Sequence, residues 1–339
     1  MNQPEQTVVI ADYDNSDVEI ERPIIEGAGL RLIAAQCTTE DEVIDAARDA
    51  DAIIVQYAPV GAKVIAALTH CRVIARSGTG VDVVDADAAT RHGILVTNVP
   101  DEWCENEVAD HALALLLAVA RKICIYDRAT RRGTWQRRTG HRIHRLRGST
   151  AGLLSFGSIA QAIAVRASGF GLRVIAYDPY RPADDIAAKG ATPVSFDELI
   201  EQADYLVIQA PLTNQTHHLI GEEELRRMKP SSFVINAARG PIVSDEALYR
   251  ALSEGWIAGA GLDDLEEEPA ARRNWRPVNP LFTLPNVVIT PHAASYSEEA
   301  IRASREFAAR EVARVLTGQQ PISPVNGEEL ARAQAQGPA

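Results

Sequence analysis

Long hydrophobic runs are absent from this 339-residue sequence. The longest apolar run, 112–120, is well short of the ~20 residues that a membrane-spanning helix needs. The N-terminal segment 1–6 is polar, and the apolar run 8–11 after it is too short for the core of a signal peptide. We therefore expect neither membrane association nor secretion, and a cytoplasmic location.

Cysteine is scarce, with four residues in the whole chain. Cys37, Cys71, Cys104 and Cys124 show no CxxC spacing and no His/Cys cluster of the zinc type. None lies in a sequence context typical of a nucleophile. The sequence predicts four reduced thiols and no metal site.

Positive charge is in deficit overall but concentrated in one segment. The formal net charge of −12 argues against direct binding to nucleic acid, which usually requires a basic surface. Segment 131–147 nevertheless holds seven arginines and two histidines: Arg131, Arg132, Arg137, Arg138, Arg142, Arg145, Arg147, His141 and His144. Either this is a solvated loop that pairs with acidic neighbours, or it is an electropositive patch for a partner subunit or a substrate with a second anionic group.

Apolar segments typical of strands alternate with helical stretches along most of the chain, which indicates βαβ units and parallel sheets. The length favours two domains. A helix at about Glu105–Arg121 divides the two groups of strands and is apolar almost all round, so it should be buried between domains or in a subunit interface. The segment from Gln319 onward is expected to be a frayed tail. The expected strands are 8–11, 30–34, 52–56, 73–76, 94–96, 152–156, 174–178, 205–209, 233–237, 258–262 and 287–290.

A candidate dinucleotide site follows the expected strand 152–156. Gly157 lies in a tight turn before a helix, where a missing Cβ lets the backbone approach a pyrophosphate and the helix N-terminus attracts that anion. Asp178 ends the next strand, 21 residues after Gly157, close to the spacing of a dinucleotide-binding fingerprint. Its carboxylate would accept hydrogen bonds from the ribose hydroxyls of the adenosine and would repel the extra phosphate of NADP, which favours NAD. The alternatives are a plain strand–helix turn and a capping carboxylate before Pro179.

Three later strands each lead into a polar residue: Arg239, the acidic run that ends at Glu268, and His292. Ligands bind at the carboxyl ends of parallel strands, so these side chains should meet there. An arginine can hold a carboxylate and polarise a carbonyl, and a histidine supported by a carboxylate can exchange a proton. Together they suit hydride transfer to a 2-oxo acid. Each residue could instead be an isolated polar group at a strand end.

On these residues the sequence resembles the D-isomer-specific 2-hydroxyacid dehydrogenases, in particular the branch with the C-terminal-binding proteins and their bacterial dehydrogenase relatives. The resemblance runs from about Val8 to Pro324. The motifs that carry it are Ser77-Gly-Thr-Gly-Val-Asp82, Asn98-Val-Pro-Asp101, Glu107-Val-Ala-Asp110-His111, Ala238-Arg-Gly240, Asp263 through Glu268-Pro269, and Thr290-Pro-His292.

The resemblance implies an α/β fold of two doubly wound parallel-sheet domains: a discontinuous flavodoxin-like substrate domain (1–102 and 296–339) and an NAD-binding Rossmann domain (103–295). It also implies a homodimer, with the Glu105–Arg121 region close to the interface. The implied activity is NAD-dependent interconversion of a 2-oxo acid and a D-2-hydroxy acid.

The implied catalytic residues are Arg239, Glu268 and His292, with Glu266 and Glu267 as the nearest alternatives to Glu268. The cofactor-binding set implied by the resemblance and the fingerprint is Gly157, Ser158, Ile159, Asp178, Pro211, Ala237, Ala238, Arg239, Asp263 and His292. The implied substrate-binding set is Ser77, Gly78, Thr79, Arg239 and His292, with backbone N–H groups of the Ser77–Gly80 loop offered to the substrate carboxylate.

Two other functions stay open at this point. One is an NAD(H)-binding sensor or scaffold of the C-terminal-binding protein type with little turnover. The other is a dehydrogenase fold with weakened cofactor affinity, because Ser155 replaces the first glycine of the fingerprint and Ser158 stands where the family often has arginine. The side chain of the substrate is not predicted.

Overall fold

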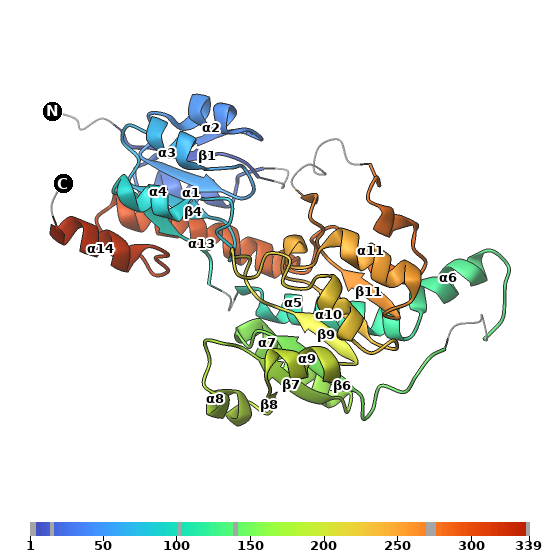
Figure 1. Ribbon diagram of the computed structural model, residues 1–339. Helices are drawn as coiled ribbons and strands as arrows, with labels where there is room; N and C mark the ends of the chain where they lie inside the picture. Colours follow the sequence, from blue (N-terminus) through green and yellow to red (C-terminus); the bar gives the residue numbers. More distant parts are fainter. Residues whose placement is uncertain (1–4, 14–16, 101–102, 138–141, 269–275, 337–339) are drawn as a thin grey trace. The chain divides into compact units, whose positions relative to one another are not determined.

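The computed structural model describes residues 5–13, 17–100, 103–137, 142–268 and 276–336. The chain folds into two compact units, one formed by residues 1–103 with 297–339 and the other by residues 104–296 (Figure 1). The first unit is therefore discontinuous in sequence. No helix within the described ranges is long and apolar enough to cross a membrane.

The first unit contains a five-stranded parallel sheet in the order β2-β1-β3-β4-β5. This is the flavodoxin-like order of a doubly wound sheet. Successive side chains of a strand face opposite sides, so Val8 and Val9 contribute to different hydrophobic clusters. The strands are β1 (Thr7–Ile10), β2 (Arg31–Ala34), β3 (Ala52–Val55), β4 (Val73–Arg76) and β5 (Leu95–Thr97).

Helices cover both faces of this sheet. Helices α2 (Glu40–Ala47), α3 (Ala62–Ala67) and α4 (Ala86–Arg91) cover one face, and α1 (Glu21–Gly27) and α13 (Glu298–Leu316) cover the other. A buried ion pair joins α13 to α1, with Arg305 Nε and Nη2 each 2.7 Å from a carboxylate oxygen of Glu21. The pair fastens the C-terminal part of the unit to its N-terminal part.

The second unit contains a seven-stranded parallel sheet in the order β12-β11-β10-β9-β6-β7-β8. Counted within the unit this is the Rossmann order with one added strand, and the order reverses between β6 and β9. The strands are β6 (Thr150–Leu154), β7 (Arg173–Tyr177), β8 (Thr192–Pro193), β9 (Tyr205–Ile208), β10 (Phe233–Asn236), β11 (Gly259–Leu262) and β12 (Val287–Ile289).

Helices also cover both faces of the second sheet. Helices α5 (Glu105–Ala120) and α7 (Ser158–Gly169) belong to one hydrophobic cluster, and α9 (Phe196–Gln202), α10 (Glu222–Arg227) and α11 (Asp245–Glu254) to the other. The remaining elements are α6 (Ile123–Arg131), α8 (Ala183–Ala188), η2 (Gly240–Ile242) and η3 (Pro280–Thr283). Figure 1 shows α6 projecting from the body of its unit.

The structure confirms the predicted fold class, and it differs from the sequence-based expectations in two elements. Strand β8 was not predicted, because it has two residues and one is a proline. The expected frayed tail instead contains helix α14 (Gly327–Gln336). It is fixed by buried Asn326, whose side chain accepts the Val96 amide and donates to the Ile94 carbonyl.

The predicted apolar helix is α5, with eight buried residues. It packs against α7, β10 and β11 within the second unit, which accounts for its burial.

Candidate active site

The turn between β6 and α7 lies beside the point where the strand order reverses. Gly157 is the N-cap of α7, and a Cβ there would meet no atom within 4 Å, so the space in front of the helix is open. Ser158 and Ile159 begin the helix, whose N-terminus attracts anions. The turn therefore fits the phosphates of a dinucleotide.

Ser155 adopts a left-handed backbone conformation with φ of 76°. This explains why glycine would suit the position, since L side chains rarely adopt it. Asp178 stabilises the turn: its Oδ2 accepts the Phe156 amide at 2.9 Å and the Ser155 hydroxyl at 3.3 Å. Its Oδ1 accepts the Tyr180 amide. Asp178 thus stabilises the turn through both of its carboxylate oxygens.

Arg239 follows β10 and precedes η2. Buried Asn236 fixes this turn, because its side chain accepts the Ala238 amide and donates to the Arg239 carbonyl. Gly240 lies so close to the 265–266 backbone that a Cβ would overlap the Leu265 carbonyl group. The glycine requirement thus reflects contact between two loops at the carboxyl ends of β10 and β11. Ala237, in the predicted cofactor-binding set, lies in the same turn.

His292 follows β12 and has a left-handed backbone with φ of 50°. Asp263, after β11, holds this strained conformation. Its carbonyl accepts the His292 amide at 2.6 Å, and its carboxylate accepts the Ala293 and Ala294 amides at 2.9 and 2.7 Å. Strain of this kind persists where surrounding contacts determine the geometry, and it is concentrated at functional sites.

Two residues outside the predicted set complete the Asp263 network. Thr290 donates its hydroxyl to Asp263 at 2.5 Å, and His111 Nε2 lies 2.9 Å from that hydroxyl and 3.3 Å from the carboxylate. Burial raises the pKa of Asp263, but the hydrogen bonds from His111, Thr290 and the two alanine amides outweigh it, so that the pKa lies below its ordinary value.

The structure brings Glu268 and His292 into direct contact, with Glu268 Oε1 2.5 Å from His292 Nδ1. The nearer alternatives have other positions. Glu266 contacts His218 Nε2 at 3.2 Å and accepts the Asp245 amide, and Glu267 is exposed. With Nδ1 facing Glu268, the Nε2 atom of His292 is the one that can exchange a proton with a substrate.

Asp264 is a second carboxyl group beside this pair, with only 3% of its side chain exposed. Burial and the charge of Glu268 raise its pKa to about 7, against the opposing effects of His292 and the Gly240 amide. Sequence reasoning missed Asp264, because in an acidic run it reads as one solvated carboxylate among several.

The predicted substrate-binding residues Ser77, Gly78 and Thr79 lie in the first unit, after β4. The Ser77 and Gly78 amides donate to the Val55 and Arg76 carbonyls. The expectation that the Ser77–Gly80 loop offers backbone N–H groups to a substrate stays a prediction. Pro211 follows β9 in the second unit, and its carbonyl accepts the Thr216 hydroxyl. Asp101 and Pro269 lie outside the described residues.

The sequence model of one family, described as "D-isomer specific 2-hydroxyacid dehydrogenase, NAD binding domain", matches residues 113–294. The chain belongs to the D-isomer specific 2-hydroxyacid dehydrogenase family. Its matched segment includes the α7 turn, the Arg239 turn and the Glu268–His292 pair. The predictions of the family and of a dinucleotide-linked oxidoreductase are confirmed.

Similar proteins extend this result over most of the chain. A glyoxylate reductase of Korarchaeum cryptofilum is 40% identical over 293 residues, which cover 84% of this chain and 86% of the relative. A solved glyoxylate reductase from Paecilomyes thermophila has a TM-score of 0.85 at 27% identity, covering 96% of this chain and all of the other. An acyclic imino acid reductase solved with NADPH and D-Arg has a TM-score of 0.83 at 28% identity, covering 94% of this chain and all of the other.

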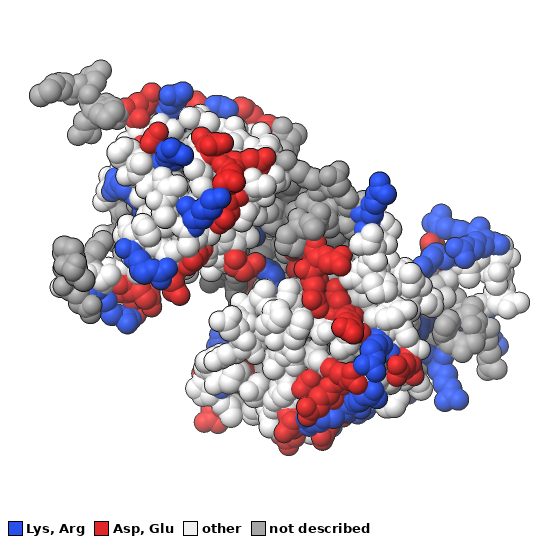
Figure 2. Space-filling view, turned by 45° about the horizontal axis from the view of Figure 1, so that its top comes forward, with Lys and Arg blue, Asp and Glu red and all other residues white. Residues whose placement is uncertain are grey.

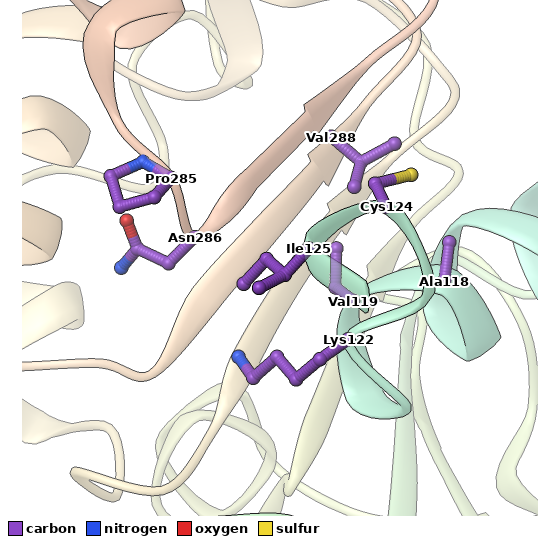
Figure 3. Close-up of a pocket in the computed structure, with 8 residues that line it drawn as sticks. All are labelled: Ala118, Val119, Lys122, Cys124, Ile125, Pro285, Asn286 and Val288. Atoms are coloured by element: carbon purple, nitrogen blue, oxygen red, sulfur yellow. The ribbon is translucent and has the colours of Figure 1, made fainter. Parts of the chain in front are cut away.

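One small pocket in this dehydrogenase is lined by residues of the α5–α6 region and of the segment around β12 (Figure 3). Pro285 and Asn286 precede β12, whereas His292 follows it, so the pocket is at the amino end of that strand. Substrates of open α/β sheets bind at the carboxyl ends, so we do not assign the active site to it. The lining residues are Ala118, Val119, Lys122, Cys124, Ile125, Pro285, Asn286 and Val288.

The arginine-rich segment 131–147 of the dehydrogenase begins at the last residue of α6. Figure 2 shows basic side chains gathered on this projecting part of the molecule. The described arginines, at positions 131, 132, 137, 142, 145 and 147, are all exposed, which favours the solvated interpretation. Arg138 and His141 lie outside the described residues.

Proposed function

We propose that this protein interconverts a 2-oxo acid and the corresponding D-2-hydroxy acid with NAD(H), with His292 as the acid–base residue. The observation that carries the proposal is the Glu268–His292 contact at the carboxyl ends of β11 and β12. A carboxylate on Nδ1 stabilises the charged imidazole and fixes its orientation. The strained backbone of His292, held by Asp263, supports a functional role for the position.

The α7 turn would hold the dinucleotide pyrophosphate, with Gly157, Ser158 and Ile159 closest to it. When bound, the dinucleotide supplies or accepts the hydride of the reaction. We propose NAD rather than NADP, because the Asp178 carboxylate at the end of β7 would repel a ribose phosphate. Binding of NADH and NADPH to the wild type and to Asp178→Asn, followed by fluorescence, tests this choice; equal affinity of the wild type for both dinucleotides would contradict it.

In the reducing direction His292 would donate the Nε2 proton to the oxygen that becomes the hydroxyl group. Glu268 would stabilise the imidazolium before that transfer, and in the oxidising direction His292 would take the proton back. Arg239 would hold the substrate carboxylate through its guanidinium fork. We retain Ser77, Gly78 and Thr79 as a proposed substrate-binding turn.

The names of the similar proteins suggest where to begin with substrates. The Korarchaeum relative and the Paecilomyes structure are both named as glyoxylate reductases. We therefore propose small 2-oxo acids as the first substrates to test, with glyoxylate and pyruvate ahead of bulky and dianionic examples.

The test is NADH oxidation with a panel of 2-oxo acids by the wild type and two histidine variants. His292→Gln should lose turnover by about a hundredfold or more, as expected when an acid–base group is removed. His218→Gln is a matched control, because His218 also has a left-handed backbone and faces a carboxylate, that of Glu266. Equal turnover by the wild type and His292→Gln would contradict the assignment.

The same assay separates the enzyme from a sensor or scaffold. Tight NADH binding without turnover across the panel would favour the sensor, and no binding would implicate the Ser155 turn.

We further propose a homodimer, which light scattering tests. Helix α6 has no buried residue and exposes Ile123 by 55%, so it presents an apolar side chain for a second subunit to cover. The cytoplasmic location stays a prediction.

A further inference from the structure

Asp264 lies in the loop that carries Glu268 and contacts the turn that carries Arg239. Its Oδ2 accepts the amide of Gly240, directly after Arg239, at 3.2 Å, and its Oδ1 accepts the Leu265 amide at 2.7 Å. These bonds fix the carboxyl group between the Arg239 turn and the loop 263–268. The carboxyl group is buried there and has little contact with solvent.

The same carboxyl group faces the acid–base pair. Asp264 Oδ2 lies 4.0 Å from His292 Nδ1, and a carboxyl oxygen of Asp264 lies within 4.8 Å of one of Glu268. Two carboxyl groups this close disfavour each other's ionisation, so one of them tends to keep a proton. The structure therefore places three titratable groups in one cluster, in which the histidine faces two carboxyl groups.

Charged groups of neighbouring elements also make contacts around the cluster. His111 on α5 contacts Asp263, and Asp245 on α11 contacts Glu266. The Arg239 guanidinium donates to the Ala238 carbonyl within its own turn. Glu268 and Asp264 each place a carboxyl oxygen within 4.0 Å of His292 Nδ1.

We propose that Asp264 is a second carboxyl partner of His292, which shares a proton with Glu268 at neutral pH and, once ionised, keeps the imidazole charged to a higher pH. The inference rests on the proposed function, in which the charged imidazole is the proton donor. Asp264 acts through His292, so it is a positioning residue and not a catalytic one.

Protonation of the carboxyl pair affects the imidazole beside it. Burial and the charge of Glu268 favour a proton on Asp264 and raise its pKa to about 7. Once that proton is lost, the second negative charge opposes loss of a proton from His292. In such a cluster the titration steps belong to the group as a whole.

The experiment measures protonation of His292 without turnover. Diethyl pyrocarbonate reacts with neutral imidazole, and peptide mass spectrometry identifies the modified histidine at each pH. The test variants are Asp264→Asn and Asp264→Ala, so that one neutral variant remains if the other does not fold. The matched control is Glu267→Gln, which removes the same charge from an exposed residue of the same loop.

We expect the midpoint for His292 modification to fall by roughly one pH unit or more in both Asp264 variants, as removal of a unit charge about 4 Å away implies. Glu267→Gln should leave it unchanged. An unchanged midpoint in the folded Asp264 variants, or an equal shift in the control, would overturn the proposal. Because no turnover is needed, failure of the proposed function is scored separately by the NADH assay.

A chelator control addresses one other explanation. Single donor atoms of Asp264, Glu268 and His292 lie within 4.8 Å of one another, a spacing that a divalent cation can also use. The modification is therefore repeated with EDTA. A midpoint independent of EDTA supports proton sharing, and a midpoint that moves with the chelator would contradict it.

Discussion

Replacing Asp263 by asparagine should destabilise the second unit, because its carboxylate organises the loop that carries His292. The carboxylate accepts the Thr290 hydroxyl and the Ala293 and Ala294 amides at 2.5, 2.9 and 2.7 Å. An asparagine keeps one acceptor oxygen, and its NH₂ group would face at least one N–H donor. A buried donor would then have no acceptor.

The size of the effect follows from these contacts. A hydrogen bond to a charged group contributes about 1.5–3 kcal/mol, and an unsatisfied buried donor costs about 1–3 kcal/mol. We therefore expect Asp263→Asn to lower the free energy of unfolding by about 3–5 kcal/mol at pH 7. Thr290→Val, which removes one donor, should cost about 1–3 kcal/mol, and Thr290→Ser should cost least because it keeps the hydroxyl.

Urea denaturation followed by circular dichroism measures these differences. The pKa of Asp263 in the folded chain lies below the ordinary 3.8. Its contribution is therefore present above about pH 4 and is lost as the pH falls through the folded pKa. The difference between the wild type and Asp263→Asn should shrink in acid. A loss below about 1 kcal/mol at pH 7, smaller than a single charged hydrogen bond, would refute the role given to Asp263.

Three further variants test other parts of the structure. Ser155→Gly should raise the free energy of unfolding, measured in urea, by up to about 1 kcal/mol. The left-handed backbone strains serine, and the hydrogen bond to Asp178 that would be lost is long. A fall of about 1 kcal/mol in the free energy of unfolding would contradict this. Arg305→Leu leaves Glu21 buried without its partner and should cost about 3–5 kcal/mol, so an unchanged denaturation midpoint would count against it. Burial raises the pKa of Asp245 to about 6, so this group contributes a fall in stability as the pH rises from 4 to 6. Asp245→Asn should make the fall smaller in a pH series of denaturation curves, and an identical pH dependence would exclude this contribution.

The fold was predictable because parallel sheets bury their strands on both faces. The runs that form β3 and β9 are apolar and continuous, so the sequence marks them clearly. Strand β8 escaped prediction because two residues carry no such pattern. The helix α14 escaped it because Asn326, its anchor, reads as an ordinary loop residue until its hydrogen bonds are seen.

The candidate site was predictable only in part. Arg239, Glu268 and His292 are polar residues after apolar strands, and that pattern is visible in the sequence. The network around them is not, because it depends on tertiary contacts. His111 contacts Thr290, which is 179 positions away in the sequence, and Thr290 contacts Asp263, which is 27 positions away.

The measurement that tests the central claim most directly is the fate of deuterium from NADH labelled at the transferred position, with pyruvate as the 2-oxo acid. We predict that the wild type forms D-lactate with deuterium at the second carbon, and that His292→Gln forms little while His218→Gln forms as much as the wild type. A product of L configuration, a product without deuterium, or equal formation by His292→Gln would contradict the account.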